Sequence, residues 1–267
     1  MRAAAARVSP WVLAALLAAA GWQGRVEDGP LMDPCCGAGT IVIEAAQIAC
    51  GIAAGGQRHF AFERMLPFKP FAAAWRELQR AAKARVHAPA VQLFAGDVSF
   101  RMTDFASRNA ERAGVRDAID FKTVDALQRL PPVVQGTIVM NPPYGERLDA
   151  KGTGSGTGLR TGSGPGSGQG SGQGFGASDR VPRERFEGGG TPAEFFGQLA
   201  SHWKHHYAGW TAWLLSPEMK LPTLMRLKES RRVPLFNGAI ECRLFRFDMT
   251  AGAGPGGRAA PSAQAAG

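Results

Sequence analysis

The sequence predicts an α/β fold: a mostly parallel sheet covered by helices on both faces, with an antiparallel hairpin at its C-terminal edge. Three observations support this prediction. Strand-like and helix-like segments alternate along the chain, as they do in parallel sheets with crossover helices. Residues 133–140 form a nearly continuous apolar run, typical of a central strand buried on both faces. Asn237-Gly238 separates two β-prone runs, which is the strongest short-range hairpin signal.

The first part of the chain reads as helix, strand, turn and helix. Residues 10–20 are rich in Ala and Leu and stop at Gly21, so we expect a helix packed on the domain rather than a signal peptide or a membrane span. A short buried strand ends at residues 31–33, and a tight turn follows. Residues 40–49 place apolar side chains at helical spacing, which predicts a helix lying against the sheet.

The middle of the chain continues the alternation. An Ala- and Arg-rich helix is expected over 71–85, a strand over 91–95 and a helix over 105–113 that ends at a glycine. Another strand is expected over 119–124, before the apolar strand already described.

The last part begins with a helix over 192–207 and a strand over 210–215. Residues 216–228 read as a loop with a helix, and the hairpin strands are expected over 232–236 and 239–247.

Glycine divides the chain into regions. Of 35 glycines among 267 residues, 12 lie between Gly152 and Gly176, and such a tract cannot bury enough apolar surface to offset its ordering entropy. We therefore expect residues 1–29 to be an N-terminal helix and connection, and residues 30–248 to be one catalytic domain. A disordered Gly/Ser-rich insertion is expected at about 150–190, and a disordered tail at 249–267.

Charge and cysteine usage bound the partners. The formal net charge is +9, which favours an anionic partner such as nucleic acid, although a solubilising surface is an equal alternative. The four cysteines form neither a secreted disulfide framework nor a zinc motif, so a reducing cytoplasm is expected. No apolar run is long enough to span a bilayer, so we expect no membrane. His202 and His206 have the i, i+4 spacing of metal ligands, but no third ligand stands nearby, so we expect no metal.

Two candidate binding features follow predicted strands. The turn Asp33-Pro-Cys-Cys36-Gly37-Ala-Gly39 precedes a helix, so its glycines allow a ligand to approach the backbone and the helix offers free N–H groups. A plain strand–helix turn is the alternative reading. Asp97 closes the next strand and could accept both hydroxyls of a ribose, unless it is a solvated turn residue.

Asp125 follows the third strand of the pattern. Its carboxylate could meet an adenine amino group, and a helix N-cap is an equally good reading.

The sharpest motif is Asn141-Pro142-Pro143-Tyr144, which follows the apolar strand. Two prolines fix the backbone, so the Asn141 side chain and the Pro142 carbonyl are two rigidly held acceptors. Together they can each accept one hydrogen of a planar NH₂ group and aim its nitrogen lone pair at an electrophile. Tyr144 supplies a flat face on which a base can stack.

Together these motifs resemble the class I S-adenosylmethionine-dependent methyltransferases that modify exocyclic amines. The wider sequence resembles the RlmL family of bacterial 23S rRNA guanine-N2 methyltransferases. The segments that carry this resemblance are 60–63 with Trp75, 109–115, 141–147 and 236–244. It implies a Rossmann-like, seven-stranded methyltransferase fold, S-adenosylmethionine as cofactor, and 23S rRNA or a large-subunit precursor as partner.

The resemblance also implies a role for each matching residue. Asn141, Pro142 and Tyr144 would hold the target guanine. The residues of the cofactor site would be Asp33, Cys36, Gly37 and Gly39 around the methionine part, Asp97 on the ribose, Val98 on the adenine ring and Asp125 on the adenine amine. Three positions depart from the family pattern: Cys35 replaces Met, Ala38 replaces Ser, and residues 96–99 lack a second acidic residue.

Alternatives remain open at this point. The Asn-Pro-Pro-Tyr motif also suits an amino-methyltransferase acting on DNA adenine or on a protein glutamine, since each presents a planar NH₂. A non-catalytic RNA-binding remnant is a further alternative. Members of the family normally carry an N-terminal RNA-binding THUMP domain, and the resemblance starts after it. The chain is therefore expected to be a fragment, a mis-started reading frame or a form without that module.

Overall fold

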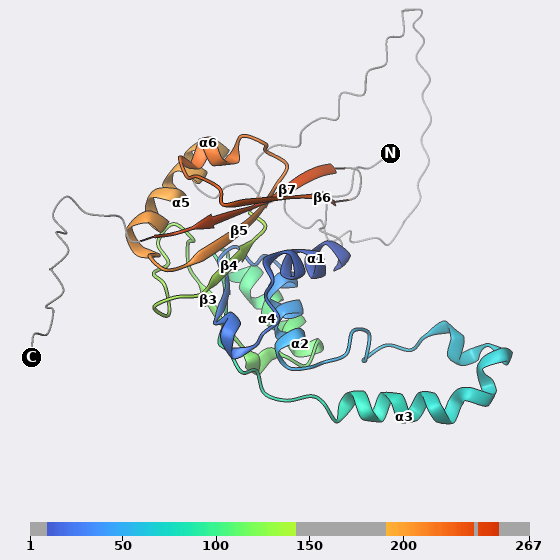
Figure 1. The fold of residues 1–267 in the computed structure, drawn as a ribbon. Helices are drawn as coiled ribbons and strands as arrows, with labels where there is room; N and C mark the ends of the chain where they lie inside the picture. Colours follow the sequence, from blue (N-terminus) through green and yellow to red (C-terminus); the bar gives the residue numbers. More distant parts are fainter. Residues whose placement is uncertain (1–9, 143–190, 238–239, 251–267) are drawn as a thin grey trace, which may run out of the picture.

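The computed structural model describes residues 10–142, 191–237 and 240–250. Seven strands form one sheet in the order β3-β2-β1-β4-β5-β7-β6 (Figure 1). In chain order they are β1 (Leu31–Asp33), β2 (Leu93–Asp97), β3 (Ile119–Thr123), β4 (Thr137–Met140), β5 (Thr211–Ser216), β6 (Arg231–Asn237) and β7 (Ile240–Asp248). Strands β1 to β5 pair in parallel, and β7 pairs antiparallel with β5 and β6. This confirms the predicted class I methyltransferase fold.

The strand order creates a switch point beside β1. From β1 the chain proceeds outward through β2 to β3, and then returns to place β4 on the other side of β1. In open α/β sheets a ligand binds beyond the carboxyl ends of the strands at such a point. The predicted site residues are attached to these same strand ends.

Side chains on the central strands alternate between two hydrophobic clusters. Trp213 and Leu215 on β5 belong to one cluster, whereas Ala212 and Leu214 belong to the other. All four are buried. This period of two is what a strand buried on both faces requires.

Helices cover both faces of the sheet, as Figure 1 shows. One face carries α1 (Pro10–Ala20), α2 (Thr40–Ala49) and α4 (Phe100–Arg112), and the other carries α5 (Pro192–His206) and α6 (Leu221–Met225). Helix α1 buries Leu16 and Leu17 in the same cluster as the sheet residues. Its apolar side chains are therefore used in packing, as expected for a helix on the domain surface.

Helix α5 starts with a complete capping box. The Thr191 hydroxyl accepts from the Glu194 backbone N–H at 3.3 Å, and the Glu194 carboxylate accepts from the Thr191 N–H at 2.7 Å. Pro192 follows at the first helical position. These residues fix the start of the helix just after a gap in the described chain.

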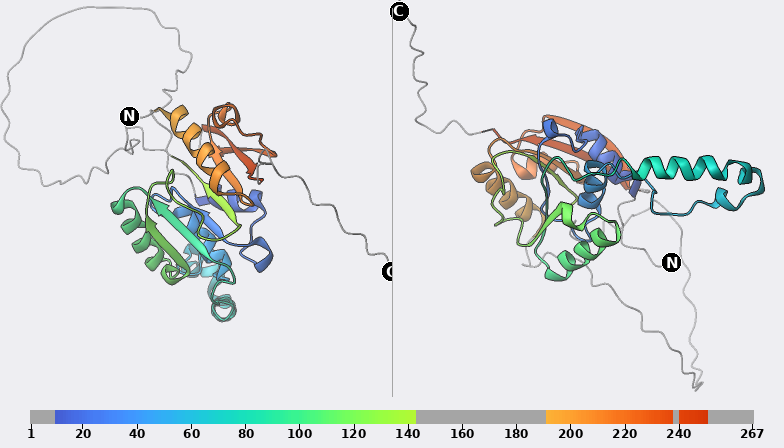
Figure 2. Two further views of the ribbon diagram at one scale, coloured as in Figure 1. Left: turned by 90° about the vertical axis from the view of Figure 1, so that its left-hand side faces the viewer. Right: turned by 90° about the horizontal axis from the view of Figure 1, so that it is seen from below.

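A helical arm departs from this layered body between α2 and β2. It contains two 3₁₀ segments, η2 (Ala61–Arg64) and η3 (Leu66–Phe71), and the helix α3 (Ala72–Lys83). Figure 1 and the right-hand view of Figure 2 show the arm projecting away from the sheet. None of the residues in these three segments is buried.

Several element boundaries differ from the sequence predictions by one or two residues, and two starts differ by more. Strand β4 starts at Thr137 rather than at Val133, and Val134 is 89% exposed, because the segment after the Pro131-Pro132 pair is bent. Helix α4 starts at Phe100, five residues before the predicted start. The apolar side chain of its first residue, Phe100, is 75% exposed, so the apolar periodicity marks only the later part of the helix.

Several expectations fall outside the described residues. These are Tyr144, the turn residue Gly238, the Gly/Ser-rich insertion at about 150–190 and all but the first residues of the tail at 249–267. Within the described ranges, every helix is too short or too polar to cross a bilayer.

Candidate active site

The predicted site residues lie at the carboxyl ends of four neighbouring parallel strands. Asp33 ends β1 and is paired in register with Ala95 of β2, so Asp97 lies two residues further along its own strand. Asp97 is in turn paired with Thr123, two residues before Asp125. The fold therefore brings together residues that are up to about a hundred positions apart in the sequence.

The glycine turn after β1 is held against the end of β2. The Cys36 N–H donates to the Gly96 carbonyl at 2.7 Å, and the Gly37 N–H donates to the Asp97 carboxylate (Oδ2) at 3.0 Å. Gly37 has a φ of +51°, and a Cβ added there would meet only the tip of Met102, at 4.0 Å. Open space therefore lies beside the backbone at Gly37, where a ligand can approach it.

A glycine is needed at position 39 for a different reason. Its φ is +85°, and a Cβ there would lie 2.9 Å from the Ala106 Cβ and 3.2 Å from the Ile43 side chain. Any side chain at this position would push α4 away from the turn. The two glycines therefore have different roles: Gly37 leaves room for a ligand, and Gly39 allows α4 to pack closely against the turn.

Asp97 is a half-buried carboxylate with both oxygens engaged. Oδ2 accepts from Gly37 N–H, and Oδ1 accepts from Ser99 N–H at 2.9 Å. A carboxylate offers about four acceptor positions, two on each oxygen. One position on each oxygen therefore remains for a pair of hydroxyl groups such as those of a ribose. Val98, the next residue, is 47% exposed, which leaves its side chain accessible for an adenine ring.

Asp33 is fully buried beside this carboxylate. Burial raises the pKa of Asp33 and the negative charge of Asp97 adds to the rise, whereas a hydrogen bond from the Cys35 N–H at 3.3 Å opposes it, so that the pKa is raised to about 8. A carboxyl group with such a pKa is largely neutral at pH 7. A positively charged ligand beside Asp33 would favour the ionised form of the carboxyl, and the ionised carboxyl would attract that ligand.

Cys36 is buried in the same turn. Burial raises the pKa of its thiol, and the nearby charges of Asp33 and Asp97 raise it further. The thiol therefore stays protonated at physiological pH, which excludes a thiolate nucleophile at this position.

Asp125 shapes a turn after β3. Its Oδ1 accepts from the Leu127 N–H at 2.9 Å, and its carbonyl accepts from the Gln128 and Arg129 N–H groups. The segment after Asp125 is a hydrogen-bonded turn and no helix starts there. The alternative prediction, that Asp125 is a helix N-cap, is therefore wrong. The side chain nevertheless does cap the backbone, at the edge where an adenine amine would be expected.

Asn141 and Pro142 directly follow β4. This strand is the neighbour of β1, with Leu31 paired to Thr137 and Met32 to Ile138. Asn141 is half-buried and Pro142 is buried. The two predicted amine acceptors thus lie at the switch point, next to the strand that leads into the glycine turn.

Arg129 is a buried part of the site that sequence reasoning missed. Its guanidinium (Nη1) donates to the Ala95 carbonyl at 2.7 Å, and the residue is only 4% exposed. A Cβ on Gly96 would overlap Nη1, so the glycine before Asp97 makes room for this arginine. The positive charge of Arg129 also opposes the rise in the pKa of Asp33.

The Arg129 carbonyl is itself held by two side chains from the end of α5. The Tyr207 hydroxyl donates to it at 2.7 Å, and His202 Nε2 lies 2.7 Å away and must donate as well, because a carbonyl only accepts. Burial raises the pKa of Tyr207 to about 12, so this hydroxyl keeps its proton. His202 therefore has a structural partner, and the described residues contain no group of three or more side chains suited to hold a metal.

A second missed contact ties α4 to the glycine turn. The Asn109 side chain donates from Nδ2 to the Ala38 carbonyl at 2.9 Å. Asn109 belongs to one of the segments that carry the family resemblance, yet its position in a helix gave no sign of this contact.

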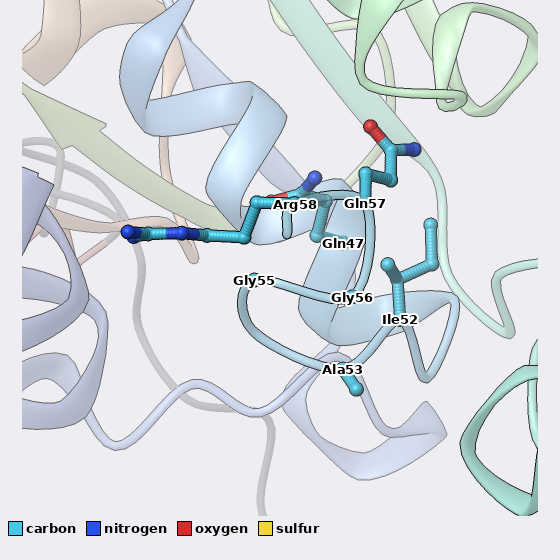
Figure 3. A pocket seen from close by; sticks show the side chains of 7 residues that line it. All are labelled: Gln47, Ile52, Ala53, Gly55, Gly56, Gln57 and Arg58. Carbon is cyan, nitrogen blue, oxygen red and sulfur yellow. The ribbon is translucent and has the colours of Figure 1, made fainter. Parts of the chain in front are cut away.

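A cavity of about 250 Å³ lies elsewhere, around the loop after α2 (Figure 3). It is lined by Gln47, Ile52, Ala53, Gly55, Gly56, Gln57 and Arg58. Since α2 begins at the glycine turn and Gln47 is near its other end, this cavity is separated from the candidate site by most of the helix, about 15 Å in length. It is not part of the candidate site described above.

The residues of the candidate site fit S-adenosylmethionine. Gly37 leaves space at the backbone, Asp97 retains acceptors for ribose hydroxyls, and Asp33 offers a buried carboxyl to a cationic group.

Comparisons with known proteins agree with this fit. Residues 2–156 match the protein family described as RMKL-like, methyltransferase domain. A ribosomal RNA large subunit methyltransferase K/L from Shewanella baltica (strain OS185) is 33% identical over 232 residues, which are 85% of this chain and 27% of that protein. Its namesake from Shewanella loihica is 32% identical over 241 residues, 88% of this chain and 28% of that protein. The chain thus spans about a quarter of the length of these relatives.

Solved structures share the fold. SMU.472 in complex with SAH superimposes with a TM-score of 0.69 at 22% identity, covering 92% of this chain and 54% of that one. A predicted N6-adenine-specific DNA methylase from Listeria monocytogenes gives a TM-score of 0.65 at 22% identity, covering 92% and 53%. With its fold, its candidate site and its sequence in agreement, the chain belongs to the RMKL-like methyltransferase domain family, is related to the large-subunit rRNA methyltransferases K/L and has S-adenosylmethionine as its cofactor.

Proposed function

We propose that this protein transfers a methyl group to the exocyclic N2 amine of a guanine in 23S rRNA. The observation that carries the proposal is the position of Asn141-Pro142 at the end of β4, beside the strand that leads into the glycine turn. The predicted amine acceptors and the predicted cofactor residues then lie at the same edge of the sheet, at the ends of neighbouring strands. A cytoplasmic enzyme acting on the ribosomal large subunit or its precursor is what this function requires.

The residues of the chain act by binding and orientation. Asp97 holds the ribose, Val98 packs on the adenine ring, Asp125 meets the adenine amine, and the turn with Asp33, Cys36, Gly37 and Gly39 surrounds the methionine part. Bound S-adenosylmethionine supplies a methyl group that its sulfonium already activates. Positioning of this kind can supply about 7–11 kcal/mol of the barrier, so no covalent enzyme intermediate is needed.

At the other side of the crevice, Asn141 Oδ1 and the Pro142 carbonyl each accept one hydrogen of the target amine. The nitrogen lone pair would then be directed along the remaining direction, toward the methyl carbon. As the new N–C bond forms, the C–S bond would break to leave S-adenosylhomocysteine, and the methylated amine would release one proton to solvent. Tyr144, which lies outside the described residues, would stack on the guanine. The base has to leave its stack to enter the crevice, at a cost of a few kcal/mol.

Three considerations favour RNA guanine over the other planar amines. The relatives that cover most of this chain are named as large-subunit rRNA methyltransferases. The protein named as a DNA methylase shares the fold at 22% identity, which supports the architecture alone. The net charge of +9 suits a large polyanion.

In the test, the purified chain is incubated with S-adenosylmethionine that carries a labelled methyl group. Three acceptors are supplied: 23S rRNA lacking its natural methylation, duplex DNA and a protein extract. Label is expected in rRNA alone, and nuclease digestion is expected to yield N2-methylguanosine. Label in adenine of DNA or in protein would contradict the proposal. A chain that the cofactor stabilises but that labels none of the three would favour the RNA-binding remnant.

A further inference from the structure

The arm between α2 and β2 begins and ends at one place. The His87 N–H donates to the Cys50 carbonyl at 3.0 Å, which joins its two ends. Gly51 has a φ of +67°, and a Cβ there would lie 2.8 Å from the Arg85 carbonyl oxygen, so only glycine allows this close approach. Residues 52–86 are therefore a closed excursion from the body, which we call the arm.

Aromatic rings give the arm a fixed shape. Phe60 and Phe62 pack edge-on against Trp75, with ring centroids 5.6 and 5.0 Å apart, and Phe62 also contacts Phe68 at 5.5 Å. These rings join the 3₁₀ segments to α3. The arm therefore holds itself together although the sheet does not cover it.

Large apolar side chains remain exposed on the arm. Phe71 is 62% exposed and Leu78 is 58% exposed. Met65, Leu66 and Phe68 are exposed as well. An apolar surface presented in this way on a preformed projection indicates a contact with another molecule.

The charge of the arm indicates which molecule. Residues 52–86 contain seven Lys and Arg residues against two Glu residues, so the arm carries a formal net charge of +5 in a chain that totals +9. Both acids are already engaged within the arm, since Glu77 pairs with Arg80 and Glu63 lies 3.8 Å from His59. Basic side chains alternate with exposed rings along the same projection.

We propose that the arm binds a single-stranded segment of RNA, with its Lys and Arg side chains on phosphates and its exposed rings stacked on bases. Cationic grooves combined with aromatic platforms are the general means of binding single strands. A second copy of the chain is disfavoured because it would place +5 against +5. The inference rests on the proposed function only in taking RNA as the natural polyanion.

The position of the arm gives the bound RNA a path. The arm leaves the body at the C-terminal end of α2, about 15 Å from the glycine turn at its N-terminal end. Arg58 lines the cavity at the foot of the arm (Figure 3). Its guanidinium carbon lies 5.2 Å from the centroid of the Phe60 ring. A strand held by the arm is therefore a flanking part of the substrate, distinct from the nucleotide that enters the crevice.

The electrostatic part is tested with the double variant R80Q/K83Q, matched to R108Q/K122Q. Arg80 and Arg108 each belong to an exposed pair within one helix, and Lys83 and Lys122 are exposed. The full chain is titrated with a fluorescein-labelled, 20-nucleotide single-stranded RNA at several salt concentrations. Each phosphate contact on a single strand contributes about 0.7 to the slope of log association constant against log salt concentration. Removal of two contacts is therefore expected to reduce the magnitude of this slope by about 1.4. The matched pair is expected to keep the wild-type slope.

The stacking part is tested with Phe71→Ala, matched to Phe236→Ala. These side chains are 62% and 63% exposed, and Phe236 lies on β6, at the edge of the sheet. Loss of one stacked base lowers RNA affinity by roughly 5- to 150-fold without changing the salt slope. Phe236→Ala is expected to bind RNA as the wild type does.

Each outcome decides the proposal. Wild-type RNA affinity in both arm variants would overturn the proposal. If RNA affinity is kept but the arm variants lose binding to phosphatidylserine vesicles, the arm binds membranes and the proposal is wrong. If RNA affinity is kept but a wild-type dimer dissociates in Phe71→Ala, the arm is a dimer contact and the proposal is again wrong. The melting-temperature rise with S-adenosylmethionine is measured in every variant and is expected to be unchanged. If the wild type methylates no RNA but the arm variants lose RNA affinity, the proposed function fails and the arm stands. If RNA is methylated but arm variants bind it normally, only the arm assignment fails.

Discussion

Helices α2 and α3 are of similar length and both are rich in alanine, yet they have opposite environments. Five of the ten residues of α2 are buried, whereas none of the twelve residues of α3 is. Helix α2 carries Ile and Val on the side that faces the sheet, while α3 has charged residues on most of its turns. Apolar side chains at helical spacing predict α2 and alanine content predicts α3, and the branched aliphatic residues of α2 determine that this helix joins the core.

The same contrast separates two functional regions. The N-terminal end of α2 adjoins the candidate site, where the buried Asp33, the half-buried Asp97 and a glycine turn suit a small ligand. The other end leads into the arm, where exposed rings and basic side chains suit a large one. Substitutions in the body should therefore change stability or cofactor binding, and substitutions in the arm should change neither.

The largest stability effect is expected in the body. Trp203 of α5 is 1% exposed within a hydrophobic cluster, and Trp203→Ala is expected to lower the free energy of unfolding by about 3–5 kcal/mol. Urea denaturation measures this value. Gln198→Ala, on the exposed side of the same helix, is the control and should stay within about 0.5 kcal/mol of the wild type. Equal stabilities of the two variants would mean that α5 does not pack as described.

Asp97→Ala is expected to weaken the affinity for S-adenosylmethionine by roughly 10- to 100-fold. The substitution removes acceptors for the cofactor and for the Gly37 and Ser99 N–H groups, and a hydrogen bond to a charged group contributes about 1.5–3 kcal/mol. Isothermal titration calorimetry measures the dissociation constant. Asp104→Ala, on an exposed position of α4, serves as the control, and an unchanged affinity in Asp97→Ala would refute the assignment of Asp97.

Asp33→Asn is expected to change how stability depends on pH. The pKa of Asp33 is raised from 3.8 to about 8 in the folded chain, so the folded state keeps a proton that the unfolded state releases. The stabilisation from this group is complete below about pH 4 and is lost as the pH rises through about 8.

Asparagine cannot ionise, so the melting temperature of the variant should gain on that of the wild type as the pH rises from about 4 to about 8. A change of 1 kcal/mol corresponds to about 2–4 °C in a domain of this size, which differential scanning calorimetry resolves. Parallel curves for the two proteins would show that Asp33 titrates normally.

The smallest effect is expected in the arm. Leu78→Ala removes a side chain that is 58% exposed on α3, and the free energy of unfolding should change by less than about 0.5 kcal/mol. Urea denaturation is again the measurement. A loss comparable to that of Trp203→Ala would show that the arm packs on the body.

Much of the fold was predictable because its elements carry strong local signals. The helix over residues 10–20 has the predicted bounds, and β6 and β7 pair as the Asn-Gly turn indicates. The start of β4 was missed because apolar side chains at Val133 and Val134 look like strand residues, although the proline pair before them bends the backbone. Hydrophobicity alone does not report such a bend.

The candidate site was predictable where residues end strands. Asp33, Asp97 and Asn141 could be placed in advance because the carboxyl ends of parallel strands share one edge of the sheet. Arg129 could not, because an arginine in a turn is ordinarily exposed. Its burial depends on Tyr207 and His202 from α5, more than seventy residues later in the chain. Long-range contacts of this kind leave no local pattern.

The central claim is that Asn141 and Pro142 orient an RNA amine toward a cofactor bound in the same crevice. The most direct measurement compares Asn141→Ala with the wild type in two assays on one preparation: methyl transfer to 23S rRNA, and S-adenosylmethionine affinity by calorimetry. We predict that transfer falls by at least about 100-fold, because the amine is no longer aligned, while cofactor affinity is retained. An Asn141→Ala protein that methylates rRNA at the wild-type rate would contradict the account.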